Sequence, residues 1–189
     1  MIKISWESLN RQILSCTACP LHLNITNKVP GQGNPKADIM IIGEGPGYRE
    51  DIEGFAFVGP AGHLLTKMLA AIDIERKDVF ICNIVKCRPP NNRVPTFSEA
   101  EACKNFLRAQ LALVKPKIIV LMGSVALKNT IAPQGSITAM RGKWINIKDV
   151  WFMPTFHPAA LLRDESKKRA AWEDMKLIRQ KLEEINGKV

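Results

Sequence analysis

The sequence predicts a three-layer α/β/α domain around a four-stranded parallel sheet. Two observations support this prediction. Four short apolar runs lack any alternation of polar and apolar residues, which is typical of strands covered on both faces. Between them lie segments with apolar residues at helical spacing, so strands and helices alternate along the chain. The predicted strands are residues 38–42, 79–85, 118–122 and 150–153.

Composition limits the size and the partners of the protein. A chain of 189 residues that is 46% hydrophobic suits one domain, residues 1–189. Its 27 Lys and Arg against 18 Asp and Glu give a net charge of +9, which suits a nucleic acid partner or simply a solvated basic surface. No apolar run reaches the roughly 20 residues of a membrane span, and the start at Met1 is no signal peptide. We therefore expect a soluble, cytoplasmic protein without a membrane partner, and a monomer by default.

The N-terminal region combines a helix with a pair of cysteines. Apolar residues at helical spacing predict a helix over residues 5–15, with Ser5 placed to cap it. Cys16 and Cys19 follow in a C-x-x-C pair, which can place two thiolates on one metal centre. Residues 24–36 are rich in Asn, Gly and Pro, so an irregular crossing to the first strand is expected.

The loop after the first predicted strand is the centre of the predicted site. Residues 43–47 hold three glycines and a proline, followed by Glu50 and Asp51, and an apolar helix face covers residues 64–72. Glycine lets the backbone approach a ligand closely, whereas an acidic loop is a poor phosphate cradle. The acidic loop therefore favours chemistry on a neutral or polar group. We expect this chemistry at the loop because ligands of parallel sheets bind beyond the carboxyl ends of the strands.

Two further polar residues are predicted at the same edge of the sheet. Asn83 lies near the carboxyl end of the second strand, and His157 follows the fourth strand directly before Pro158. Taken alone, the asparagine could satisfy a loop backbone and the histidine could be an ordinary core residue. Their shared position with residues 43–47 favours a functional site.

The five cysteines argue against a disulfide framework in a cytosolic protein, since their number is odd. Cys16 and Cys19 form an N-terminal pair, and Cys87 and Cys103 a second pair from a loop and a helix, so that the four could close one thiolate site. Cys103 also lies on an apolar helix stripe and could be a small core residue, as Cys82 within a strand is expected to be. Spacing alone leaves zinc and an iron–sulfur cluster open.

The middle of the chain joins a basic loop to a long helix. Residues 86–93 form a basic, proline-stiffened loop. Ser98 and Glu101 have capping-box spacing, and the apolar face that follows ends at Pro116.

The last third of the chain predicts two helices and an edge element. A helix over residues 125–130 follows the third strand, and residues 136–148 suggest a basic edge hairpin or loop. Apolar residues from Trp172 to Ile185 mark a long amphipathic helix. Its basic start at residues 167–169 opposes the helix dipole, which suggests a nearby phosphate or an ordinary solvated face.

A set of motifs between Cys16 and Arg163 resembles the family 4 uracil-DNA glycosylases, the thermostable iron–sulfur type. These motifs stand in the family's order and cover nearly the whole chain. They are Gly43-Glu44-Gly45-Pro46-Gly47 with Glu50-Asp51, Phe57-Val58-Gly59, Asn83-Ile84-Val85-Lys86-Cys87-Arg88-Pro89-Pro90 with Asn92-Arg93, and His157-Pro158-Ala159. The resemblance implies a uracil-DNA glycosylase-like fold and an enzyme that flips uracil out of single- or double-stranded DNA and hydrolyses its N-glycosidic bond.

The resemblance implies roles around the pocket floor that begins at Gly43. Phe57 is similar to the ring that stacks on the flipped base, and Asn83 to the residue that accepts from uracil N3–H and donates to O4. His157 is similar to the histidine that donates to uracil O2, a role that does not require a cation.

The resemblance leaves the activation of water open. The best-known uracil glycosylases have an aspartate where this chain has Gly45. Glu44 and Glu50 are the available carboxylates, and Glu50 matches a family glutamate that excludes the methyl group of thymine, assists the water, or does both. We favour a largely dissociative route in which general-base help is minor.

The resemblance also implies a structural [4Fe–4S] cluster on Cys16, Cys19, Cys87 and Cys103. DNA contacts are expected from the basic loop and from the segment after His157, with arginines near phosphates and one leucine as a wedge in the vacated stack. The residues concerned are Arg88, Arg93, Leu161, Leu162 and Arg163. Two other classes stay open, a small iron–sulfur electron carrier and a zinc-bearing nucleic-acid-binding module.

Overall fold

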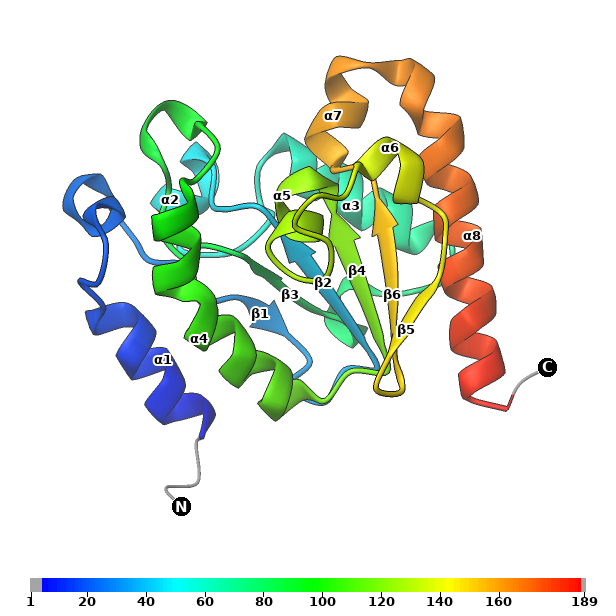
Figure 1. Ribbon diagram of the computed structural model, residues 1–189, viewed down its shortest axis with the longest axis horizontal. Helices are drawn as coiled ribbons and strands as arrows, with labels where there is room; N and C mark the ends of the chain where they lie inside the picture. The colour runs from blue at the N-terminus through cyan, green and yellow to red at the C-terminus, as the bar shows by residue number, and fades with distance from the viewer. Residues whose placement is uncertain (1–4, 188–189) are drawn as a thin grey trace.

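The computed structural model describes residues 5–187, whose strands form one six-stranded sheet in the order β1-β3-β2-β4-β6-β5 (Figure 1). Met1 to Ile4, where the absence of a signal peptide was expected, lie outside the described residues. The strands are β1 Gln32–Gly33, β2 Ile39–Gly43, β3 Phe80–Asn83, β4 Ile118–Met122, β5 Ile145–Ile147 and β6 Val150–Thr155.

The predicted strand count was wrong, because the sheet is mixed and has six strands. The four predicted strands are β2, β3, β4 and β6, which pair in parallel in the middle of the sheet. Two short strands extend it at its edges, β1 antiparallel to β3 and β5 antiparallel to β6. β1 falls in the segment 24–36 that was expected to be irregular. It was not predicted because two residues are too few to show a pattern. The β5–β6 pair agrees with the expected edge hairpin.

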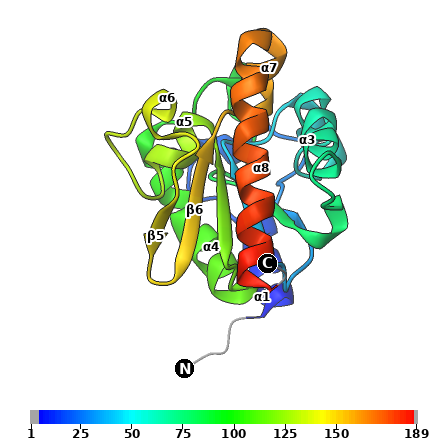
Figure 2. The same cartoon turned by 90° about the vertical axis from the view of Figure 1, so that its right-hand side faces the viewer.

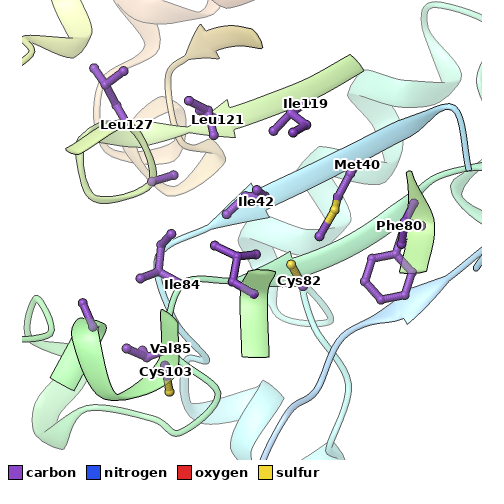
Figure 3. Close-up of a cluster of buried hydrophobic side chains, with 14 of the residues drawn as sticks. Met40, Ile42, Phe80, Cys82, Ile84, Val85, Cys103, Ile119, Leu121 and Leu127 are labelled. Carbon is purple, nitrogen blue, oxygen red and sulfur yellow. The ribbon is translucent and has the colours of Figure 1, made fainter. Parts of the chain in front are cut away.

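Helices cover both faces of the sheet, which confirms the three-layer α/β/α arrangement. Met40 and Ile42 of β2 point into one apolar cluster and Ile39 and Ile41 into another, because side chains alternate along a strand. The first cluster, shown in Figure 3, lies under α1 and α4 to α6, and the second under α3 and α8 (Figure 2). The helices are α1 Trp6–Ser15, α2 Tyr48–Glu53, α3 Pro60–Ala70, α4 Phe97–Val114, α5 Gly123–Lys128, α6 Ile137–Met140, α7 Pro158–Arg163 and α8 Lys168–Ile185.

Capping decides where two of these helices begin. The Ser5 hydroxyl accepts from the Ser8 N–H at 3.2 Å, as predicted for α1. The predicted cap of α4 was wrong by two residues, because α4 is capped by Thr96 with Glu99 as its reciprocal partner. Both pairs have capping-box spacing, and in the structure Glu99 also forms an ion pair with Arg93.

The basic start of α8 has local partners. Lys167 forms an ion pair with Asp164 at 2.8 Å, and Lys168 pairs with Glu165, so acids from the preceding turn offset the unfavourable helix dipole. No phosphate is needed to explain these charges. Among residues 5–187, no helix is both long enough and apolar enough to cross a membrane.

Candidate active site

A cavity of about 420 Å³ lies at the carboxyl edge of the parallel strands. The loop after β2, the end of β3 and the loop after β6 meet there, at the tips of the strand arrows in Figure 1. The structure places seven residues of the predicted site on its wall, in addition to Arg93. They are Glu44, Gly45, Glu50, Phe57, Asn83, His157 and Arg163.

Asn83, the last residue of β3, carries an unpaired acceptor. Its side chain is 2% exposed, and its Oδ1 accepts no hydrogen bond from the described residues. Buried polar atoms nearly always have a partner, and leaving one unpaired costs about 1–3 kcal/mol. Because Asn83 lines the cavity, the missing partner is expected to be a donor on a ligand.

Gly43 allows the amide of Asn83 and the ring of Phe57 to lie close to its backbone. A Cβ atom at Gly43 would lie 2.5 Å from Asn83 Oδ1 and 2.6 Å from Phe57 Cζ, distances that real Cβ atoms do not adopt. Gly43 is not itself on the cavity wall, but its lack of a side chain leaves the space that Asn83 and Phe57 occupy there.

Phe57 stands on an unusual backbone. Its φ of 54° is in the left-handed region that residues other than glycine seldom adopt, and such strain persists only where neighbours hold it. The Arg76 guanidinium donates to the carbonyl of the preceding Ala56 at 2.6 Å, and the Gln32 side chain accepts from the Ala56 N–H at 2.9 Å. The Phe57 ring stacks on His157 with centroids 5.4 Å apart.

The hydrogen bonding of His157 fixes its tautomer. Its Nδ1 lies 3.1 Å from the main-chain nitrogen of Ala159 and accepts that N–H, so the proton of the neutral ring is on Nε2. Burial, reinforced by the charge of Arg163 and opposed by Glu50, lowers the pKa of His157 to about 4. The ring is therefore neutral at physiological pH and offers one N–H donor.

Glu50 is occupied by the backbone of two loops. Its Oε1 accepts from the N–H groups of Val58 at 2.9 Å and Gly59 at 2.8 Å, and its Oε2 accepts from Gly47 at 3.1 Å. This buried carboxylate therefore ties the loop after β2 to the segment that carries Phe57. Glu50 is the third residue of α2, from where it accepts from the N–H of the N-cap Gly47; this is one half of a capping box, since glycine has no side chain to supply the other half.

The other carboxylate on the cavity wall is Glu44. Burial raises its pKa, and the nearby Arg163 opposes the rise. The adjacent Gly45 faces Val85, since a Cβ atom there would lie 2.7 Å from Val85 Cγ2. A larger residue at Gly45 would require Val85 to move.

Four of the five cysteines line a second, smaller cavity, on the α1 and α4 side of the sheet. They come from three segments, Cys16 and Cys19 after α1, Cys87 after β3 and Cys103 within α4. Burial and the neighbouring thiols raise the pKa of Cys87 to about 12. Cys82 lies elsewhere, packed in the core as expected (Figure 3).

The donor set of this cavity consists of free thiols. Within residues 5–187, no group of three or more His, Cys, Asp or Glu is arranged to hold a single metal ion. The rest of the wall is mostly apolar, contributed by Ile13, Ala18, Ala102 and Phe106 with His22 and Lys86. Four thiols on one largely apolar wall suit a group that binds thiolates.

Two of the predicted DNA-contacting arginines are engaged by the protein itself. Arg93 donates to both oxygens of Glu99, at 2.7 and 2.8 Å, and this contact lowers the pKa of Glu99 to about 2. The Arg88 guanidinium lies 5.1 Å from the Tyr48 ring centroid, and its Nε donates to Asn92 at 2.8 Å. Arg93 therefore serves first to fix the loop before α4.

The two candidate wedge residues of α7 differ in exposure. Leu161 is 2% exposed and packs with Phe156 and Ala171, whereas Leu162 is 49% exposed. A residue fixed in the core cannot enter DNA, so the expectation for Leu161 conflicts with its position. Arg163 follows at the cavity mouth and is exposed.

Sequence reasoning missed the burial of Lys86, which it grouped with the basic loop. Lys86 is 1% exposed and contacts Asn83 and Gln110 within the protein. The apolar Ile84 and Val85 directly before it were the available signal, since they continue the buried run of β3.

Several known proteins are similar to this chain over most of its length. A family model described as "Uracil DNA glycosylase superfamily" matches residues 30–176. A Type-4 uracil-DNA glycosylase of Thermotoga maritima is 49% identical over 175 residues, which is 89% of this chain and 90% of the relative. Proteins of the same description from Sulfurisphaera tokodaii and Archaeoglobus fulgidus are 45% and 42% identical, covering 93% and 92% of this chain and 84% and 92% of their own.

Proposed function

The chain belongs to the uracil-DNA glycosylase superfamily, and from this membership we propose that it is a monofunctional DNA-repair hydrolase. It flips uracil out of DNA and hydrolyses the N-glycosidic bond, leaving free uracil and an abasic site. The unpaired, buried Oδ1 of Asn83 is the observation that carries the substrate assignment.

Recognition of uracil rests on the amide of Asn83. Uracil offers an N3–H donor beside the O4 acceptor, so one amide can accept at Oδ1 and donate at Nδ2. Cytosine presents the reverse pattern and would leave buried polar groups unpaired, which discriminates strongly. The ring of Phe57 provides the stacking surface for the flipped base.

Bond cleavage places negative charge on uracil and positive charge on the sugar. When the C1′–N1 bond breaks, its electron pair goes to the uracil ring and is shared with O2. The neutral His157, with its proton on Nε2, donates to O2 and stabilises that charge. No proton transfer from the imidazole is required.

Water then adds to C1′ and loses a proton. Glu44 is the better candidate to receive that proton, because three backbone donors already occupy Glu50. Burial raises the pKa of Glu44, which suits weak general-base help in a largely dissociative reaction. Glu50 instead holds the walls of the pocket together, and from the same place it limits the room beside the base.

We further propose that Cys16, Cys19, Cys87 and Cys103 hold a [4Fe–4S] cluster. The four thiols share one mostly apolar cavity, and their three segments would be joined by a common group. Such a cluster supplies cross-linking, and none of the catalytic steps above involves it. Cys87→Ala should lose iron, visible absorbance and thermal stability together, with Cys82→Ala as the control that keeps its iron. A colourless, iron-free wild-type protein that holds zinc would contradict the cluster.

Contact with DNA is proposed at the cavity mouth. Arg163 and Arg88 are placed to approach phosphates, and Leu162 is the exposed apolar residue that can fill the vacated stack. Arg93 contributes by fixing its loop. The five free cysteines support a reducing, cytoplasmic setting, where we propose that the whole chain works as a single-domain monomer on single- or double-stranded DNA.

The function is tested with an oligonucleotide that contains one uracil. Incubation followed by alkali should cut the strand at uracil and leave a matched thymine strand intact. Asn83→Asp should slow single-turnover excision on the order of 100-fold or more, because a carboxylate cannot donate to O4. An intact uracil strand with the wild-type protein would refute the glycosylase. Scission by wild type and variant at equal rates would remove Asn83 as the reader.

A further inference from the structure

Lys86 is a buried lysine that no step of the proposed reaction uses. It lies just after β3, three residues beyond Asn83, and its side chain is 1% exposed. Burying an ammonium group costs free energy unless hydrogen bonds or charges compensate it. Its position between the two cavities therefore requires an explanation.

The Lys86 ammonium group joins two elements by short hydrogen bonds. Its Nζ donates to the main-chain carbonyl of Asn83 at 2.7 Å and to Oε1 of Gln110 on α4 at 2.7 Å. Gln110 is fully buried and donates in turn to the carbonyl of Pro30 at 2.6 Å. Lys86 and Gln110 thus form a bracket between the end of β3, α4 and the segment before β1.

The opposite side of the same backbone segment is fixed by the loop after β2. The Ile84 N–H donates to the carbonyl of Gly43 at 3.0 Å, and the Val85 N–H donates to the carbonyl of Glu44 at 3.2 Å. The main chain at Asn83 is therefore held from both sides, while its side-chain Oδ1 has no partner among residues 5–187. Because Asn83 lines the cavity, the fixed main chain determines where its amide can meet a ligand.

The surroundings of Lys86 favour a role in geometry over an ion pair. Within residues 5–187, Lys86 has no carboxylate partner within 4.0 Å. It also lines the four-cysteine cavity, where no carboxylate of the described residues lies on the wall.

We propose that Lys86 and Gln110 are positioning residues for uracil recognition, which act by fixing the main chain of Asn83. The inference rests on the proposed function, because it concerns how the reader of the base is held. The competing explanation is that the two side chains only fill space and stabilise the fold.

A double-mutant cycle separates these explanations, with single-turnover excision of uracil as the measurement. Lys86→Met keeps an unbranched side chain, one atom shorter, and removes both hydrogen bonds. We expect it to slow excision by about 10- to 100-fold in the wild-type background, because the main chain of Asn83 loses the hydrogen bond that holds it. In an Asn83→Ala background the same substitution should change the rate less than 3-fold, because its target is already gone.

Three further measurements keep the test decisive. Lys104→Met, an exposed lysine of α4 paired with Glu101, is the matched control and should leave the rate unchanged. Gln110→Leu breaks the hydrogen bond to Lys86 at a residue that does not line the four-cysteine cavity. It should repeat the effect if Lys86→Met does not fold. Gln110→Glu keeps the acceptor for Lys86 and should recover much of the rate lost in Gln110→Leu.

Binding provides a readout that a purely structural role would not move. Affinity for DNA with a non-cleavable 2′-fluorinated deoxyuridine should fall about 10-fold in Lys86→Met, and affinity for DNA with an abasic site should not change. Visible absorbance and iron content should match the wild type. Equal slowing in both backgrounds would overturn the inference, whereas a wild-type protein that cuts no uracil strand would instead refute the proposed function.

Discussion

Replacing Glu50 with glutamine separates a loop clamp from a catalytic base. The carboxylate accepts three main-chain N–H groups, two at Oε1 and one at Oε2. Glutamine has the same shape but only one oxygen. If that oxygen keeps the hydrogen bonds from the N–H groups of Val58 and Gly59, the NH₂ group of the glutamine faces the N–H of Gly47. Two donors then lie opposite each other.

The expected loss follows from this geometry. One buried donor loses its partner, which costs about 1–3 kcal/mol, and the two retained hydrogen bonds lose the strength that the charge added. A neutral side chain is easier to bury and offsets part of this loss. We therefore expect Glu50→Gln to lower the free energy of unfolding by about 2–4 kcal/mol.

Denaturant unfolding and single-turnover excision, measured on the same preparation, provide the assay. Glu53→Gln is the matched control, because Glu53 lies on the same helix with 44% of its side chain exposed and only a 3.9 Å pair to Arg49. It should change stability by less than about 0.5 kcal/mol. If Glu50→Gln kept wild-type stability but lost excision more than 100-fold, the clamp would be wrong and Glu50 would act in the chemistry.

Three other predictions follow from the site. Because the pKa of His157 falls from 6.5 to about 4 on folding, the unfolded chain takes up its proton first, so this residue should lower stability by up to about 3 kcal/mol as pH falls from 6.5 to 4. Unfolding curves of wild type and His157→Asn across this range check it, and parallel curves would contradict it. Gly43→Ala should abolish excision while far-ultraviolet circular dichroism stays native, since its Cβ would meet the Asn83 amide; full activity would show that the floor can yield. Leu162→Ala should slow excision from duplex DNA without changing the melting temperature, whereas Leu161→Ala should cost about 2–5 kcal/mol of stability, and the reverse result would exchange their roles.

The parallel centre of the fold could be predicted because its strands have an unmistakable pattern. Residues of β2 and β4 are apolar on both faces, and the structure buries every one of them. That pattern also placed Asn83 and His157 at one edge, where the structure has them. The edge strand β1 has only two residues and pairs with β3, far along the chain, so no local pattern marks it, whereas β5 pairs with the adjacent β6 in the segment expected to form an edge hairpin or loop.

Side-chain partners were harder to predict than positions. Arg93 and Lys86 belong to one basic segment, yet the first pairs with Glu99 and the second is buried against Gln110. A run of positive charge shows only that cations are present, whereas their use depends on acceptors supplied by α4. The left-handed backbone of Phe57 likewise has no local signal, since the surrounding loops impose it.

The unpaired acceptor of Asn83 also sets a limit on engineering this protein for heat resistance. An orphaned buried oxygen is the kind of defect that stability optimisation removes, and an apolar residue of similar size would raise the melting temperature. The same change would remove the group that we propose distinguishes uracil from cytosine. Selection for thermostability alone would therefore favour stable but inactive variants at this position. Screens should measure excision activity as well as the melting temperature.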